Sequence, residues 1–187
     1  MRTGMALLWG VALMLGGSLH AVAYSAWDAL RDGRALLLLR HATAPGLGDP
    51  PGFVLDDCRT QRNLDERGRQ EARRWGTLLR RQWIEQPRLY SSRWCRALDT
   101  AREMQLGVVQ PLPPLDSFFE KAARAERQTR ALCEAINALP RGAPLVLVSY
   151  QVNITALSGV YPASGEGLIL ALPLTVPARV LARIPPL

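Results

Sequence analysis

Arg40 and His41 are the residues best suited to chemistry in this sequence, and they end the apolar run Leu36–Leu39. A continuous apolar run of this length, bounded by polar residues, is typical of a central strand that is buried on both faces. Open α/β folds bind ligands at the carboxyl edge of the sheet, where such a strand would place both side chains. Two basic groups there suit an anionic ligand, so the pair is a candidate active site. A solvated strand end is the alternative interpretation.

Three further segments carry polar residues close to the expected ends of strands or starts of helices. They are Gln61–Leu64 with Arg67 and Gly68, then Ser91–Ala101, and then Val146–Asn153. Together with Arg40 and His41, and in this order, these segments resemble the motifs of the histidine phosphatase superfamily, also called phosphoglycerate mutase-like. The resemblance extends from about Ala35 to Gly159.

A phosphate pocket is what the resemblance implies. His41 would be the nucleophile that becomes phosphorylated, Arg40 its neighbouring phosphate-binding arginine and Arg96 the second arginine of the pocket. A neutral imidazole attacks phosphorus, while guanidinium groups bind the phosphoryl oxygens and neutralise the charge of the transition state. Ser92, or the start of its helix, would supply further donors. Arg62 would approach the leaving-group side or form a structural salt bridge. Neither a metal nor another cofactor is expected.

Tyr150 is a departure from the family, because the superfamily normally places a second histidine at this position. The only other histidine is His20, in the amino-terminal segment. A tyrosine donates one hydrogen bond, so Tyr150 is expected to contact the substrate, but it carries no positive charge near neutral pH. Losing one charge-assisted donor would cost about 10²- to 10³-fold in rate.

The general acid is not obvious from the sequence. Some relatives use an acidic residue in the loop after the second arginine, where this chain has Asp116 and Glu120. We predict Asp116 as the catalytic acid. A solvated loop carboxylate is the alternative for Asp116, and Glu120 could equally cap the following helix.

Alternating strand and helix patterns predict a three-layer α/β/α sandwich with a largely parallel central sheet, formed by residues 24–187. The expected strands are 35–40, 88–91, 108–109, 144–150, 167–172 and 179–184, the last a candidate antiparallel edge. The expected helices are 27–31, 65–84, 92–104 with Ser92 as N-cap, 119–139 and 153–157. A loop as long as 41–62 is usually functional or disordered.

The length of 187 residues and the hydrophobic content of 48% fit one domain with a sizeable core. Arg2, the apolar stretch Met5–Leu15 and the small residues of Ala21–Ala23 predict a cleaved secretory signal at residues 1–23. The stretch is shorter than the roughly 20 residues of a membrane-spanning helix. An uncleaved anchor is the alternative, and would be the only link to a membrane. In either case we expect the domain in the periplasm or outside the cell.

Net charge is +7, which favours an anionic ligand. The arginines crowded on the expected helix 65–84 lack interleaved aromatic residues for base stacking, so nucleic acid is not expected as a partner. A small phosphorylated substrate or ligand is the expected partner, and the oligomeric state is left open.

The three cysteines, Cys58, Cys95 and Cys133, are widely spaced and do not suggest a zinc site. In an oxidising compartment one pair could form a disulfide, and the sequence does not choose the pair. Cys133 lies among apolar residues of an expected helix and is predicted to be a buried thiol.

Three functions stay open at this point. The first is a phosphomonoester hydrolase that forms a phosphohistidine at His41, with activity reduced by Tyr150. The second is a pseudophosphatase that binds a phosphorylated ligand without useful turnover. The third is an envelope-associated protein that binds anionic surfaces through its arginine-rich helix.

Overall fold

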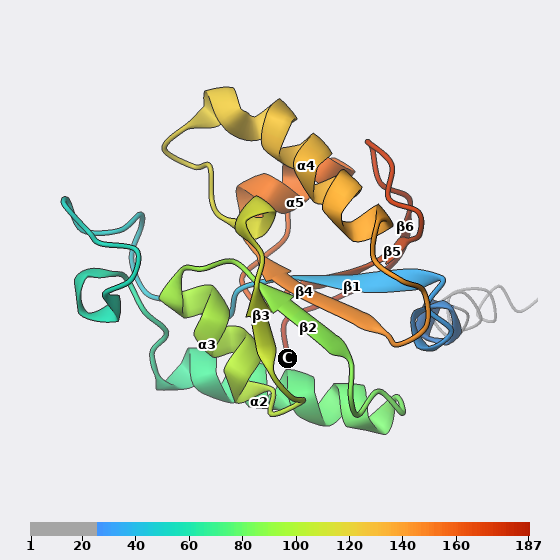
Figure 1. Ribbon diagram of the computed structural model, residues 1–187. Coiled ribbons are helices and arrows are strands. Elements are labelled where there is room, and N and C mark those ends of the chain that lie inside the picture. The colour runs from blue at the N-terminus through green and yellow to red at the C-terminus, as the bar shows by residue number, and fades with distance from the viewer. Residues whose placement is uncertain (1–25) are drawn as a thin grey trace, which may run out of the picture.

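A central six-stranded sheet lies between two layers of helices in the computed structural model, which describes residues 26–187 (Figure 1). The strand order is β3-β2-β4-β1-β5-β6. The strands are β1 Ala35–Arg40, β2 Arg88–Ser91, β3 Val109–Pro111, β4 Leu145–Ser149, β5 Gly167–Ala171 and β6 Val180–Ile184. The pairs β1–β4, β2–β4 and β2–β3 are parallel. The predicted three-layer fold with a largely parallel sheet is confirmed.

The antiparallel part of the sheet is larger than expected. β6 pairs antiparallel to β5, and β5 in turn pairs antiparallel to β1. The reason lies in the connection before β5, where Gly165 N donates a hydrogen bond to His41 O. The chain therefore enters β5 at the carboxyl end of β1 and has to run back along it.

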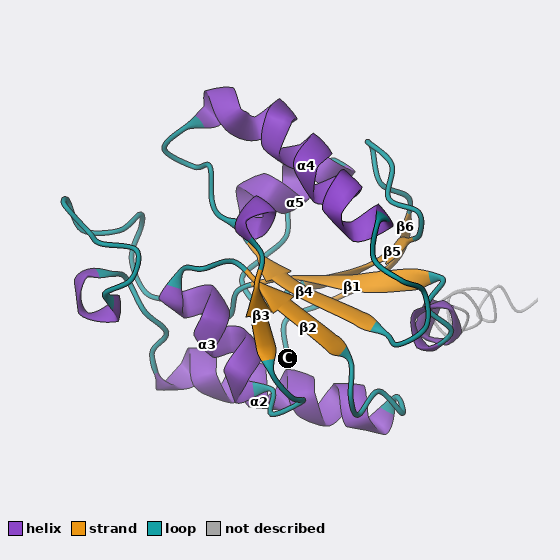
Figure 2. Ribbon diagram, viewed as in Figure 1, coloured by secondary structure: helices purple, strands orange, loops and turns teal. Residues whose placement is uncertain are grey.

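Helices cover both faces of the sheet (Figure 2). Their bounds are α2 Glu66–Arg81, α3 Cys95–Glu103, α4 Ala125–Asn137 and α5 Gln151–Ser158, and residues 26–31 are also helical. α2 and α3 pack on one face and α4 and α5 on the other. Short 3-10 turns occupy Cys58–Thr60, Pro113–Leu115 and Ala122–Arg124.

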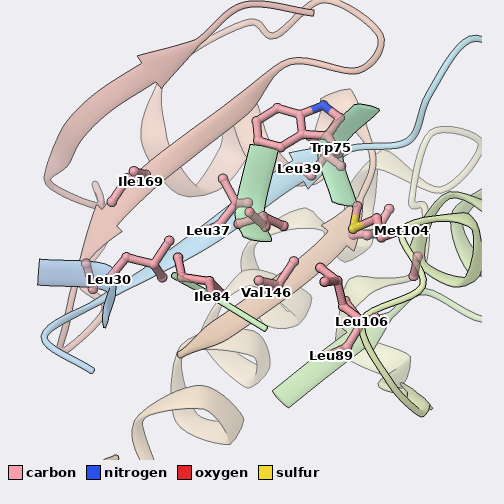
Figure 3. Close-up of a cluster of buried hydrophobic side chains, with 14 of the residues drawn as sticks. Leu30, Leu37, Leu39, Trp75, Ile84, Leu89, Met104, Leu106, Val146 and Ile169 are labelled. Atoms are coloured by element: carbon pink, nitrogen blue, oxygen red, sulfur yellow. The ribbon is translucent and has the colours of Figure 1, made fainter. Parts of the chain in front are cut away.

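The position of β1 between two helical layers explains why its sequence is continuously apolar. Leu37 and Leu39 belong to the core that contains Trp75 of α2 (Figure 3). Leu36 and Leu38 point to the opposite side, into the core formed with α4 and α5. Successive side chains of a strand face opposite ways, so a strand between two helical layers needs apolar residues at every position.

Two predicted helix starts were wrong. Ser92 does not cap α3, because its backbone N–H continues the sheet ladder to Val148 O, and Trp94 takes the N-cap position. α4 begins at Ala125 rather than at residue 119. The backbone at Lys121 is not helical and closes a turn to Phe118, whose side chain is buried.

The predicted signal peptide, residues 1–23 with His20, lies outside the described residues. Within residues 26–187, no helix combines the length and the apolar character needed to cross a membrane.

Candidate active site

His41 directly follows β1, and neighbouring elements hold its backbone on all sides. Its N–H donates to Ser149 O of β4 at 3.0 Å, and its carbonyl accepts from Gly165 N at 3.1 Å. The next N–H, of Ala42, donates to Thr100 Oγ1 of α3 at 3.0 Å. The position of the imidazole is therefore set by the sheet and by α3 rather than by a mobile loop.

α2 holds the backbone at Thr43, the residue after Ala42. The buried carboxylate of Glu71 accepts hydrogen bonds from Thr43 N at 2.9 Å and from Thr43 Oγ1 at 3.0 Å. Gly68 lies against the same backbone, where an added Cβ would come within 2.0 Å of Thr43 O. Only glycine permits this approach, which gives the Arg67-Gly68 motif a packing role.

The His41 imidazole is buried and is held in one tautomer. Nδ1 lies 2.7 Å from Ala42 O, a carbonyl that can only accept, so Nδ1 carries the proton and Nε2 keeps its lone pair. The pKa of His41 is lowered to about 3, chiefly by burial; the nearby positive charges of the pocket arginines act in the same direction, and the hydrogen bond to the Ala42 carbonyl opposes them. The ring is thus neutral near pH 7, as a nucleophile must be.

The three predicted arginines line the same pocket as His41. Arg40 donates to Pro162 O at 2.9 Å, while Arg62 donates through Nε to Gly48 O at 2.7 Å and through Nη1 to Ala44 O. Buried Nε atoms of Arg40 and Arg96 have no hydrogen-bond partner within residues 26–187. Such donors are costly to leave unpaired, and an anion with several oxygens would satisfy them.

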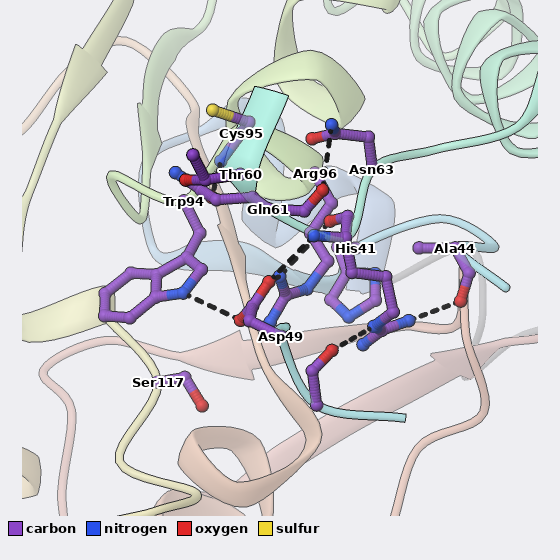
Figure 4. A network of polar contacts seen from close by, with 12 residues as sticks. His41, Ala44, Asp49, Thr60, Gln61, Asn63, Trp94, Cys95, Arg96 and Ser117 are labelled. Atoms are coloured by element: carbon purple, nitrogen blue, oxygen red, sulfur yellow. Dashed lines mark hydrogen bonds and ion pairs between the residues drawn. The ribbon is translucent and has the colours of Figure 1, made fainter. Parts of the chain in front are cut away.

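Asp49 is a residue of the site that the sequence analysis missed. Its carboxylate pairs with Arg96 Nη1 at 2.7 Å and accepts from Arg62 N at 3.0 Å and from Trp94 Nε1 at 3.1 Å (Figure 4). The sequence Gly48-Asp49-Pro50 is typical of a turn, where an aspartate usually serves the local backbone. Nothing in that pattern signals a buried ion pair with a helix that begins some 45 positions later.

Tyr150 lies beside His41, as its alignment with the second histidine implied. Its ring centroid is 5.1 Å from that of His41 in an edge-to-face arrangement, and Arg96 Cζ lies 4.8 Å from the ring centroid. Burial raises the pKa of the phenol, so the hydroxyl stays protonated. The hydroxyl oxygen is buried and has no hydrogen-bond partner in the described part of the chain.

Ser92 and Asp116 lie beside the pocket and are engaged with other groups. Ser92 Oγ donates to Asp116 Oδ1 at 3.0 Å, and Arg93 donates to the same carboxylate from its backbone N–H and its guanidinium. Neither Ser92 nor Asp116 is among the residues that line the pocket, whereas Glu120 is. Of the two candidate acids, Glu120 is the one that lines this cavity.

A disulfide joins the long loop to α3. Cys58 pairs with Cys95, which immediately precedes Arg96, and Gln61 Oε1 accepts from Cys95 N at 3.0 Å. Cys133 is a free, buried thiol, as predicted. The loop that carries Asp49 is therefore covalently attached to the helix that carries Arg96.

Comparison with known proteins places these residues in a family context. Residues 36–122 match the model of the histidine phosphatase superfamily (branch 1). A search of curated proteins found no match.

Several solved structures have a similar fold. The protein histidine phosphatase SixA complexed with tungstate is 17% identical, with a TM-score of 0.55, covering 81% of this chain and 97% of its own. The putative phosphohistidine phosphatase SixA from Nakamurella multipartitia is 18% identical, with a TM-score of 0.58, covering 82% of this chain and 96% of its own. A mycobacterial glucosyl-3-phosphoglycerate phosphatase in complex with VO3 is 19% identical, with a TM-score of 0.52 and coverage of 79% and 96%. Residues 36–122 thus resemble the histidine phosphatase superfamily (branch 1), and the chain shares the fold of these solved phosphatases.

Proposed function

We propose that this protein is a phosphatase that hydrolyses a small phosphorylated substrate through a phosphohistidine at His41. The observation that carries the proposal is the state of the imidazole. It is buried, neutral and tethered through Nδ1 to Ala42 O, so that Nε2 is free in a pocket with Arg40, Arg62 and Arg96.

In the first step, the Nε2 lone pair attacks phosphorus, a P–N bond forms and the P–O bond to the leaving group breaks. The arginines bind the phosphoryl oxygens as charge builds on them. In the second step, a water molecule attacks the phosphohistidine, the P–N bond breaks, and inorganic phosphate leaves with His41 regenerated.

Protonation of the leaving group calls for an acid at the pocket. Asp116 was predicted for this role, but its carboxylate is ion-paired with Arg93 and held by Ser92. Glu120 is exposed and lines the cavity. We therefore favour Glu120 over Asp116 as the proton donor.

Tyr150 supports a second candidate function, a pseudophosphatase that binds a phosphorylated ligand with little turnover. The tyrosine supplies a hydroxyl where the family has a histidine, so one positive charge is missing from the transition-state site. The rest of the anion pocket is present in both cases, and only the rate of P–N bond formation and hydrolysis differs.

We propose a periplasmic or extracellular location for the domain. The Cys58–Cys95 disulfide supports it, because such bonds persist in oxidising compartments and are rare in the cytosol. The expected amino-terminal signal is consistent with the same location.

The test is hydrolysis of 4-nitrophenyl phosphate by residues 24–187, compared with His41→Ala and Tyr150→His, at several pH values from acidic to neutral. Activity that disappears in His41→Ala supports a phosphohistidine phosphatase. Activity that is found only in Tyr150→His supports the pseudophosphatase. Absence of hydrolysis by both the native protein and Tyr150→His would contradict the roles assigned to His41 and Tyr150.

A further inference from the structure

The outer part of the His41 pocket carries exposed apolar side chains beside the charged residues Glu120, Lys121 and Arg124. Leu47, Phe119 and Tyr161 are 96%, 65% and 70% exposed, and all three line this cavity. They come from three separate connections: the loop after β1, the segment before α4 and the loop after α5. In Figure 1 the first two project on the same side of the sheet. Single exposed apolar residues are ordinary, but a set gathered around one cavity indicates a binding surface.

An aromatic wall connects this rim to the nucleophile. The Tyr150 ring lies 5.1 Å from the His41 ring, the Trp94 ring lies 6.1 Å from Tyr150, and Phe53 lies 5.8 Å from Trp94. Each distance is in the range where aromatic rings attract each other, and the pairs are edge-to-face or tilted. A planar apolar group entering the pocket would meet ring surfaces along this whole side.

The chemistry of the site determines what must lie against that wall. Phosphoryl transfer proceeds with the attacking and leaving atoms roughly in line, so the leaving group points away from His41 Nε2. His41 is buried at the inner end and the exposed rim lies at the outer end, so the leaving group extends toward the rim. The cavity of about 470 Å³ is far larger than a phosphate ion and falls in the range of sites for drug-sized ligands.

We propose that the substrates are aryl phosphates, that is, monoesters of phosphate with an aromatic alcohol. This rests on the phosphate pocket of the proposed function and specifies its substrate class. The phosphoryl group binds at the arginines, and the aromatic ring packs on Trp94 and Phe53 and under Leu47 and Phe119. Burial of one ring is expected to tighten binding about 10- to 50-fold over an analogue with a methyl group.

The experiment measures binding without turnover, by calorimetry with phenylphosphonate and methylphosphonate, whose P–C bonds the enzyme cannot break. The native protein should bind phenylphosphonate about 10- to 50-fold more tightly. Leu47→Ala and Phe119→Ala should each reduce this ratio about 3- to 10-fold while leaving methylphosphonate affinity unchanged. Val108→Ala is the matched control, because Val108 is 83% exposed and lies outside the cavity.

Equal affinities for the two phosphonates, absence of binding by both, or a ratio that Leu47→Ala and Phe119→Ala leave unchanged would overturn the proposal. Two further outcomes distinguish failure of the aryl phosphate proposal from failure of the proposed phosphatase function. Selective binding of phenylphosphonate by a protein with no hydrolytic activity would retain the ligand class and remove the phosphatase. Hydrolysis of 4-nitrophenyl phosphate by a protein that binds both phosphonates equally would retain the phosphatase function and remove the preference for aryl phosphates.

Discussion

The carboxylate of Asp49 and the guanidinium of Arg96 form a 2.7 Å ion pair, and their side chains are only 6% and 4% exposed. Arg96 is also one of the arginines that the proposed function assigns to the phosphoryl group. A phosphate dianion in the pocket would be repelled by Asp49 while competing with it for Arg96. The pocket therefore holds an internal anion next to the position of its proposed ligand.

Replacing Asp49 with asparagine should tighten binding of inorganic phosphate about 10-fold, because one negative charge leaves the pocket. Arg62 N donates to Oδ1 of Asp49 and Trp94 Nε1 to Oδ2, so the single amide oxygen of asparagine can keep only one of these two hydrogen bonds. The free energy of unfolding should fall by about 1–3 kcal/mol, since Arg96 loses its charged partner. Calorimetric titration with phosphate and urea unfolding measure the two effects.

Asp56→Asn is the matched control for that change. Asp56 is an exposed aspartate of the same loop, so its replacement alters the net charge equally without touching the pocket. Weaker phosphate binding by Asp49→Asn would mean that Asp49 orients Arg96 for the ligand and does not compete with it.

Replacing Tyr150 with phenylalanine should leave the free energy of unfolding unchanged or raise it by up to about 1 kcal/mol. The hydroxyl makes no well-aligned hydrogen bond in the described structure, and the nearby Ser92 Oγ is engaged with Asp116, so its removal costs little and relieves a desolvation penalty. Turnover should fall about 10-fold if the hydroxyl donates to the phosphoryl group. Urea unfolding and steady-state kinetics test the pair of effects, and a loss of stability above about 1 kcal/mol would show that the hydroxyl is bonded after all.

The free energy of unfolding should decrease as the pH is lowered from about 6.5 toward 3. The folded pKa of His41 is about 3, below its ordinary value of 6.5, so in this interval the unfolded chain binds a proton that the folded protein does not. His41→Gln removes this proton and should show a shallower pH dependence. Urea unfolding of both proteins across this interval measures the difference, and identical slopes would mean that His41 is protonated in the folded state.

Reduction of the Cys58–Cys95 disulfide should lower the free energy of unfolding by about 4 kcal/mol, the value expected for a closed loop of 37 residues. It should also weaken phosphate binding, because the loop carrying Arg62 is no longer tied to α3. Unfolding and titration with and without reductant test both effects. Cys133→Ala serves as the background, since it removes the remaining thiol, and unchanged phosphate affinity after reduction would show that the bridge does not order the pocket.

Much of the fold could be predicted because β1 and β4 are buried on both faces. Runs such as Leu36–Leu39 and Leu145–Val148 have few alternatives to a central strand, and a polar side chain at the end of such a strand must lie at the sheet edge. The positions of His41 and Tyr150 follow from this logic, and the structure brings them into contact.

The remaining features depend on contacts between distant segments. Serine is a residue type typical of a helix N-cap, yet the Ser92 hydroxyl donates to Asp116 and its backbone belongs to the sheet. Asp49 stands in a turn-like Gly-Asp-Pro sequence, and its ion pair with Arg96 exists only because the long loop folds back onto α3. The choice of Cys58 and Cys95 as the bonded pair has the same origin. Local patterns do not carry this information.

The place of His41 at the end of β1 has a consequence for how the molecule opens. β1 lies between β4 and β5, supplies leucines to both cores, and the amide of His41 itself donates to Ser149 O. Hydrogen exchange at that amide therefore requires opening of the central sheet, while amides of the exposed loop tip near Leu47 exchange through local fluctuations. The backbone of His41 is therefore expected to exchange slowly and the cavity rim near Leu47 to exchange fast, so a ligand could enter past a moving rim while the imidazole stays in place.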